Sequence, residues 1–183
     1  MEKSISDEAI ITCETTLDIN GSLCKSSTTT ERSSTVNRDN SPDFVHIINE
    51  ILGLKQVGVS TYSPLGLAYI GDSVYDLIIR SMVISKGNRQ VQKLHQESST
   101  FVQASTQSLM MRAIQEHLTE TEHAIYRRGR NSKTITPAKN QSITDYRRAT
   151  GFEALIGYLY LNEEYKRLME LIKIGLESIP EET

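Results

Sequence analysis

The sequence has few cysteines, no long apolar segment and no excess of positive charge. Only Cys13 and Cys24 occur among its 183 residues, and they lie in a polar stretch without a histidine or cysteine at metal-ligand spacing. We therefore expect free thiols. The net charge of -3 gives no overall sign of a polyanion partner, so any nucleic-acid site must come from local clustering of Lys and Arg.

Membrane and export signals are also absent. Apolar runs such as Ala154 to Leu161 fall far short of the roughly 20 residues that span a bilayer, which predicts that the chain has no membrane span. The start of the chain lacks the apolar core of a signal peptide, and its acidic residues argue against an organelle transit peptide. Those acidic residues are Glu2, Asp7, Glu8, Glu14 and Asp18. We therefore expect a cytoplasmic protein.

Several enzyme motifs are missing as well. The sequence contains no P-loop, no glycine-rich dinucleotide turn and no nucleophile elbow. Its histidines show no mutual metal-ligand spacing, and we assign them no function; they are His46, His95, His117 and His123. Any chemistry must therefore be sought among the carboxylates and the basic residues.

Residues 1–40 differ in composition from the rest of the chain. They are rich in Ser, Thr, Asn and Asp and show no sustained periodicity, so they bury too little apolar surface to offset the entropy lost on ordering. We predict a disordered polar tail. The change comes at Ser41-Pro42-Asp43, which offers a helix N-cap, a first-turn proline and an acidic residue near the positive helix end. The predicted folded domain covers residues 41–179, followed by a short tail over 180–183.

Apolar residues recur at helical spacing through this domain, and no segment shows the alternation of a strand. The predicted helices are a short one after Pro42, one over 65–85, one or two between 88 and 118, one opened by a capping box at 119–122, and two beyond 143. We expect a break at Ser98-Ser99-Thr100 and a polar loop from Gly129 to Ile143. The sequence therefore predicts a single all-α domain with its functional groups on facing helices.

Asp72 follows Gly71 inside the helix predicted over 65–85, where an isolated glycine costs about 1 kcal/mol relative to alanine. A glycine there indicates the close approach of another helix or of a bound phosphate, which would place Asp72 at a functional site. The alternative is a packing glycine beside a surface acid. Asp76 lies one turn later on the same face, where it either assists metal binding or lies in solvent.

Glu153 is the only charged residue from Ala149 to Leu161. A helix that is apolar on nearly all sides is expected to be buried, and an isolated buried carboxylate is costly. Glu153 must therefore lie at the rim, pair with a cation or coordinate a metal. The structural alternative to a metal site is an ion pair with Arg147 or Arg148.

A basic segment precedes that helix. Seven basic residues fall within 22 positions that contain one acidic residue, Asp145, which gives a local charge of +6. They are Arg127, Arg128, Arg130, Lys133, Lys139, Arg147 and Arg148. Such a cluster fits the phosphates of a nucleic-acid duplex, which contribute affinity without reading sequence. A merely solvated loop is the alternative.

The apolar stretch Ala154 to Leu161 offers more surface than a small helical domain needs for its own core. This surplus predicts a homodimer, with Tyr158 or Tyr160 as the residue that faces the partner.

Two segments together resemble the conserved blocks of a known enzyme family. They are Leu67-Ala68-Tyr69-Ile70-Gly71-Asp72-Ser73-Val74-Tyr75-Asp76 and the stretch from Tyr146 through Gly151-Phe152-Glu153-Ala154-Leu155 to Leu161. Both are similar to the blocks of the Mini-III ribonucleases, the small bacterial branch of the ribonuclease III family. The segment Tyr126-Arg127-Arg128-Gly129-Arg130-Asn131 is similar to the basic loop of that branch. The resemblance runs from about Asp43 to Glu177.

The resemblance implies an all-helical homodimer that cleaves double-stranded RNA with Mg2+ as cofactor, which Mn2+ can replace. It places the catalytic, metal-binding carboxylates on Asp72 and Glu153. The branch is associated with trimming precursors of 23S ribosomal RNA, so a ribosomal protein or a pre-ribosomal particle is a further candidate partner. The alternative from another class is a non-catalytic helical module that binds RNA or assists ribosome assembly.

This chain departs from the larger relatives in two respects. They carry two more acids, at positions that match Ala68 and Thr150 here, so the resemblance leaves the number of metal ions open. They also carry a separate double-stranded-RNA-binding domain, which we do not expect here. Duplex binding would then fall to the catalytic domain.

Overall fold

The computed structural model describes residues 44–55, 57–132 and 142–180, and within these ranges every regular element is a helix. The α-helices are α1 (Phe44–Ile51), α2 (Pro64–Ser85), α3 (Val91–Val102), α4 (Ala104–Ile114), α5 (Glu120–Arg130), α6 (Ile143–Leu161) and α7 (Tyr165–Glu177). The short 3-10 helices are η1 (Val59–Thr61) and η2 (Gln115–His117). The all-α prediction is confirmed. The tail predicted over 1–40 lies outside the described residues and stays a prediction. The same holds for residues 181–183 of the predicted C-terminal tail, of which only Pro180 is described.

The helix starts follow from local sequence signals. The Ser63 hydroxyl caps α2 by accepting a hydrogen bond from the Gly66 backbone nitrogen at 3.0 Å, and Pro64 occupies the first turn. Thr119 and Glu122 form the predicted capping box at the start of α5, with Thr119 N donating to Glu122 Oε2 at 2.7 Å. These starts are therefore fixed by residues within one helical turn.

The break predicted at Ser98-Ser99-Thr100 is wrong, because α3 continues through these residues and ends at Val102. Their hydroxyls donate to backbone carbonyls of the preceding turn, for example Ser99 Oγ to the His95 oxygen at 2.7 Å. Ser and Thr side chains that bond backwards in this way are accommodated inside a helix. The boundary between α3 and α4 instead lies at Gln103, whose backbone is extended.

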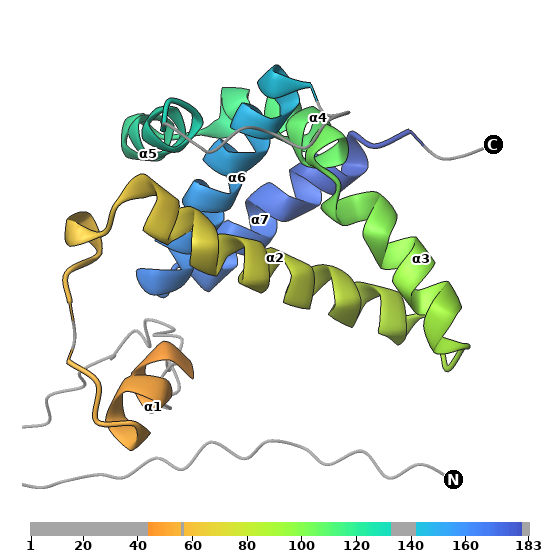
Figure 1. Ribbon diagram of the computed structural model, residues 1–183, viewed down its shortest axis with the longest axis horizontal. Coiled ribbons are helices and arrows are strands. Elements are labelled where there is room, and N and C mark those ends of the chain that lie inside the picture. Colours follow the sequence, from red (N-terminus) through yellow and green to blue (C-terminus); the bar gives the residue numbers. More distant parts are fainter. Residues whose placement is uncertain (1–43, 56, 133–141, 181–183) are drawn as a thin grey trace, which may run out of the picture. The chain divides into compact units, whose positions relative to one another are not determined.

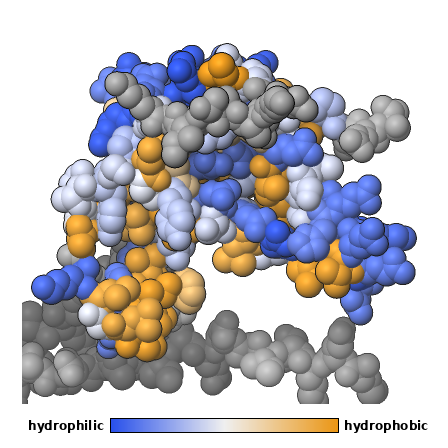
Figure 2. Space-filling view, viewed as in Figure 1, coloured by the Kyte–Doolittle hydropathy of each residue, from blue (hydrophilic) through white to orange (hydrophobic). Residues whose placement is uncertain are grey.

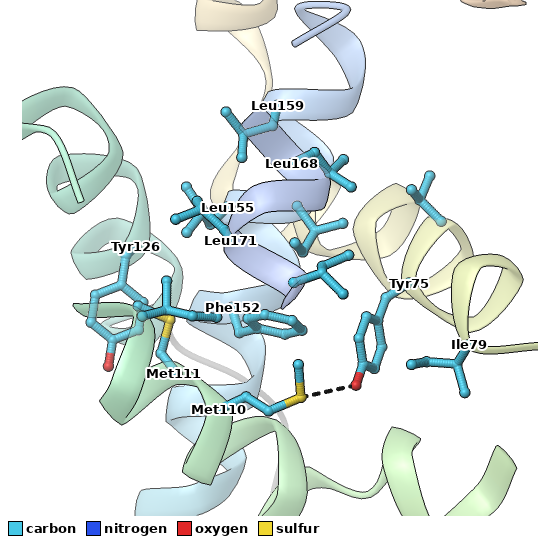
Figure 3. Packing of buried hydrophobic residues seen from close by; sticks show 14 of the residues in the cluster. Tyr75, Ile79, Met110, Met111, Tyr126, Phe152, Leu155, Leu159, Leu168 and Leu171 are labelled. Atoms are coloured by element: carbon cyan, nitrogen blue, oxygen red, sulfur yellow. Dashed lines mark hydrogen bonds between the residues drawn. The ribbon is translucent and has the colours of Figure 1, made fainter. Parts of the chain in front are cut away.

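Helix α6 is the central element and packs against α2, α4, α5 and α7 (Figure 1). The main core forms around it, and its largest side chains include Tyr75 and Phe152, whose rings meet edge to face with centroids 5.0 Å apart (Figure 3). The Tyr75 hydroxyl reaches Met110 Sδ and the Phe101 carbonyl oxygen, each at 3.1 Å. This core joins α2, α4, α5, α6 and α7, and side chains of α3 pack against it.

Helices α2 and α6 cross in close contact at two glycines. A β-carbon on Gly71 would overlap the carbonyl oxygen of Glu153, and one on Gly157 would overlap that of Leu67. Both neighbours are backbone atoms of helices and cannot move aside. The close approach that the sequence predicted at Gly71 is therefore an approach of helix α6.

Gly129 lies inside α5, although the sequence predicted that a loop begins there. A β-carbon on Gly129 would come within 2.7 Å of Ala154 Cβ and 3.0 Å of Gly151 Cα. This glycine therefore marks close packing of α5 on α6 and does not end the helix, which continues to Arg130. Of the predicted loop beyond α5, the structure describes only residues 131–132 and 142.

Apolar side chains gather in patches on an otherwise largely hydrophilic face (Figure 2). Helix α2 exposes large apolar side chains along its length: Leu65 at 40%, Tyr69 at 81%, Leu77 at 62% and Ile84 at 61%. Helix α1 buries none of its residues. Within the described ranges, each helix is too short or too polar to cross a membrane.

Candidate active site at the crossing of α2 and α6

Asp72 and Glu153 come together where α2 and α6 cross. Asp72 directly follows Gly71, and Gly71 lies against the backbone carbonyl of Glu153, so the contact between the helices holds both carboxylates at one place. Asp72 is exposed and Glu153 is half-buried at the rim. The two residues that the resemblance assigns to the active site are 81 positions apart in sequence and are close together in the fold.

Both carboxyl groups hold their protons more tightly than usual. Burial raises the pKa of Glu153 to about 7, and the negative charge of Asp72 adds to the shift. Burial also raises the pKa of Asp72, and the charge of Asp76 contributes in the same direction. A site in which negative charges disfavour one another is one that a bound cation would stabilise.

Basic side chains do not neutralise this site in the part of the chain that the structure describes. Arg148 lies 3.9 Å from a carboxylate oxygen of Asp145, and Arg147 is exposed. The predicted alternative, an ion pair of Glu153 with either arginine, is not among the ion pairs of the described ranges. Glu153 thus has the rim position expected of a metal ligand.

Asp76 has a basic partner of its own. Its Oδ2 atom lies 2.6 Å from Arg80 Nε, one turn further along α2. This ion pair partly neutralises Asp76, which still acts on the pKa of Asp72 from the neighbouring turn. Asp76 is therefore a neighbour of the site formed by Asp72 and Glu153.

The donor set for a divalent cation is small. Within the described ranges, no group of three or more His, Cys, Asp or Glu side chains is placed to hold a metal ion. Ala68 and Thr150, which match the acids of larger relatives, are each 6% exposed, and the Thr150 hydroxyl donates to the Tyr146 carbonyl at 3.1 Å. The remaining candidate ligands are Asp72 and Glu153. Two carboxylates with unfavourable mutual charge fit Mg2+, which prefers oxygen ligands and keeps several of its waters.

Gln107 is a polar neighbour that sequence reasoning missed. It lies on α4, is 1% exposed, and its amide opposes the upward shift of the Glu153 pKa, which places it beside that carboxyl group. Neither of its amide atoms makes a regular hydrogen bond to a group that the structure describes. A glutamine in a helix of mixed polarity gives no local signal of this position.

The predicted basic residues fall at several places. Arg127, Arg128 and Arg130 are exposed in the last turn of α5, where cations also complement the helix dipole. Arg147 and Arg148 lie in the first half of α6. Lys133 and Lys139 lie outside the described residues. Arg127 lines a pocket with Gln115, Glu120 and His123.

Three arginines from three helices gather around Asp145 and Tyr126. Asp145 lies 3.8 Å from Arg112 of α4 and 3.9 Å from Arg148 of α6, and it accepts a hydrogen bond from Ser108 at 2.7 Å. The charges of Arg130 and Arg148 both act on the Tyr126 hydroxyl. Arg112 was missed because it lies outside the basic segment and joins this group only through the packing of α4 on α6.

Comparison with known proteins agrees with these features. The ribonuclease III domain family matches residues 65–164. A Mini-ribonuclease 3 of Clostridium tetani is 53% identical over 113 residues, which are 61% of this chain and 75% of that protein. One from a Thermoanaerobacter species is 44% identical over 128 residues, which are 70% and 90% of the two chains. A crystal structure of a Fusobacterium nucleatum protein has a TM-score of 0.60 at 31% identity, covering 64% of this chain and 95% of that one.

The family match includes both crossing helices, and the Mini-ribonuclease 3 relatives align over most of their own length. The matched range contains Asp72 and Glu153. The chain therefore belongs to the ribonuclease III family, and it is an endoribonuclease of the Mini-ribonuclease 3 branch.

Proposed function

We propose that this protein cleaves double-stranded RNA with a Mg2+ ion held by Asp72 and Glu153, and that Mn2+ can substitute. The observation that carries the proposal is the convergence of two carboxylates, both with raised pKa values, at the crossing of α2 and α6. The described residues provide no basic partner for either one. A cation that binds oxygen ligands is the natural complement of such a pair.

The residues of the site contribute to phosphodiester hydrolysis in different ways. When bound, the divalent cation supplies Lewis-acid stabilisation for the attacking water and for the leaving oxygen. Asp72 and Glu153 supply the negative charge that retains it, and the rigid helix crossing keeps them from separating. Because the pKa of Glu153 is about 7, this residue must lose its proton before it contributes that charge. The expected products carry a 5′-phosphate and a 3′-hydroxyl.

Duplex binding is assigned to the basic residues. Arg127, Arg128 and Arg130 at the end of α5, together with Arg147 and Arg148 on α6, provide exposed or half-exposed cations from the two helices that pack beside the site. Lys133 and Lys139 remain part of this proposal. Arginine forks match phosphate oxygens in geometry and charge.

A homodimer completes the proposed enzyme, because one carboxylate pair per chain serves one strand of a duplex. The side chain of Tyr69 supports this proposal, since it is 81% exposed and lies three residues before Asp72 on α2. Tyr158 and Tyr160, which the sequence suggested for the interface, are both half-buried against the core of their own chain. The apolar side chains that α2 exposes are therefore the better supported interface.

We further propose that the natural substrate is a precursor of 23S ribosomal RNA in the cytoplasm, and that a ribosomal protein or pre-ribosomal particle presents it. The support is the Mini-ribonuclease 3 character of the similar relatives and the sequence blocks shared with that branch. Incubation of the protein with purified pre-ribosomal RNA, followed by mapping of the 5′ ends, tests this assignment. Cuts scattered over the precursor would contradict it.

The central experiment is incubation of the purified protein with an end-labelled, perfectly paired RNA duplex, with and without Mg2+. We expect internal cleavage only with Mg2+ or Mn2+, and no cleavage of a DNA duplex of the same sequence. The variant Asp72→Asn is the matched negative control. Binding of the duplex without cleavage under all metal conditions would favour the non-catalytic module.

A further inference from the structure

Gln107 carries an amide group on the buried face of α4. It is 1% exposed, and three residues of the following two turns, Met110, Met111 and Ile114, are fully buried. Met110 and Met111 point into the core (Figure 3). A leucine or methionine of similar volume would satisfy the packing at position 107, so packing alone does not account for a glutamine.

Both polar atoms of this amide, Oε1 and Nε2, are without a hydrogen-bond partner among the groups that the structure describes. A buried amide with two unmet hydrogen bonds destabilises a fold, and nearly all buried polar groups in proteins find partners. The next residue shows the normal case, since the buried Ser108 hydroxyl donates to Asp145 on α6 at 2.7 Å. Gln107 therefore retains hydrogen-bonding capacity within the described part of the chain.

The carboxyl group of Glu153 lies beside the Gln107 amide, which lowers the pKa of that carboxyl group. An ionised carboxylate accepts hydrogen bonds only, and an amide nitrogen offers two donors. The Glu153 carboxyl group offers an acceptor oxygen whether or not it is protonated, so Gln107 Nε2 can donate to it after a small adjustment of either side chain. Groups that orient a metal-binding carboxylate through such a hydrogen bond affect metal affinity and turnover together.

We propose that Gln107 is a positioning residue of the active site, whose amide nitrogen donates to the Glu153 carboxyl group and so fixes the orientation of that group. This inference rests on the proposed function, because it gives Gln107 a task only if Glu153 binds a metal. It also explains why the chain tolerates an unsatisfied amide in the core.

The test compares Gln107→Leu and Gln107→Met with the wild-type protein, using Gln103→Leu on the exposed start of the same helix as the control. Both Gln107 variants should melt at the wild-type temperature or higher, because an unsatisfied amide is removed. They should nevertheless bind Mn2+ at least roughly 10-fold more weakly by calorimetry, with a kcat for duplex cleavage lowered to a similar degree. KM for RNA should stay within about 2-fold, since Gln107 is buried and carries no charge that could bind a phosphate.

Two results would overturn the inference. If Mn2+ affinity and kcat stay at wild-type values in both variants, Gln107 is a core residue only. If both variants fail to fold, Gln107 has structural partners that the positioning role does not include. Failure of the proposed function is a separate outcome, because it would appear as Mg2+-dependent cleavage by Asp72→Asn whatever Gln107 does.

Discussion

Gly71 of α2 lies against Gly157 of α6, so close that a β-carbon on Gly71 would come within 2.7 Å of the Gly157 backbone nitrogen. The same β-carbon would overlap the carbonyl oxygen of Glu153. The close crossing is what allows the neighbouring Asp72 to share a site with Glu153. The geometry of the proposed active site therefore depends on the absence of a single methyl group.

Gly71→Ala should lower both stability and activity. Alanine gains about 1 kcal/mol in helix propensity, but overpacking against backbone costs about 1–3 kcal/mol, and no flexible side chain can yield here. We expect a net loss of up to about 2 kcal/mol in the free energy of unfolding, measured by urea denaturation, and cleavage reduced more than 10-fold. Gly58→Ala is the control, because the nearest atom to its β-carbon would be Ser60 Oγ at 3.9 Å. If Gly71→Ala cleaved RNA at the wild-type rate, activity would not depend on the close crossing of α2 and α6.

Asp72→Asn should abolish cleavage while leaving duplex binding intact, because the amide preserves shape but removes the charge that retains the cation. We expect a loss of at least roughly 100-fold in kcat, in line with the several kcal/mol that a bound metal contributes. Asp76→Asn is the matched comparison and should stay within a few-fold of wild type, because Asp76 forms an exposed ion pair with Arg80 worth less than about 1 kcal/mol. Equal losses in both variants would make Asp76 a metal ligand too.

Sequence reasoning succeeded where the determinants are local. The starts of α2 and α5 follow from Ser63-Pro64 and from the capping box of Thr119 and Glu122, and each signal acts within one turn. It failed where a residue serves a distant partner. Gly129 looked like the start of a loop because glycine often ends helices, but its role is to admit α6 beside α5.

The site shows the same division. Asp72 and Glu153 were assigned because each lies in a block that resembles the family, and their proximity was then implied. Gln107 and Arg112 could not be assigned, because their partners are on α6 and only tertiary packing brings them together. Glu122 shows how a local pattern can hide a second role: it caps α5 and also pairs with Arg167 at 2.9 Å.

Glu153→Gln should stabilise the metal-free protein at high pH. The pKa of Glu153 is raised from 4.5 to about 7 in the fold, so between these values the folded chain keeps a proton that the unfolded chain has released. Stability therefore falls as pH rises through this window, by at most about 3 kcal/mol, and the loss is complete above it. In EDTA, the variant should melt above the wild type at pH 8 and level with it at pH 4.5.

Added Mg2+ should reverse this order at pH 8, since it binds and stabilises only the ionised wild-type site. The same ionisation predicts that wild-type cleavage rises with pH between 6 and 8. If Glu153→Gln melts below the wild type in EDTA at pH 8, Glu153 forms a structural interaction that outweighs its burial.

Tyr69→Asp should produce a monomer. A tyrosine that is 81% exposed presents an apolar ring on the face of α2 that carries Asp72, and a charge there would have to be desolvated in an interface. We expect light scattering at micromolar concentration to show a dimer for the wild type and a monomer for the variant. Ile143→Asp is the control, because Ile143 is 57% exposed at the start of α6, outside α2, and should leave the dimer unchanged. A monomeric wild type would contradict the dimer itself.

Arg112, Arg130 and Arg148 should bind RNA phosphates as one group, because they come from three helices and surround Asp145 and Tyr126. Changing each to Ala should weaken duplex binding, measured with Ca2+ in place of Mg2+. The dependence of binding on log salt concentration should flatten by roughly 0.9 for each phosphate that is no longer neutralised, the value for B-DNA. Melting temperatures should change little, because the ion pairs of Asp145 are long, at 3.8 and 3.9 Å. Lys173→Ala is the control, since Lys173 is exposed on α7 beside Glu177. An unchanged salt slope in the arginine variants would move the RNA-binding surface away from α4, α5 and α6.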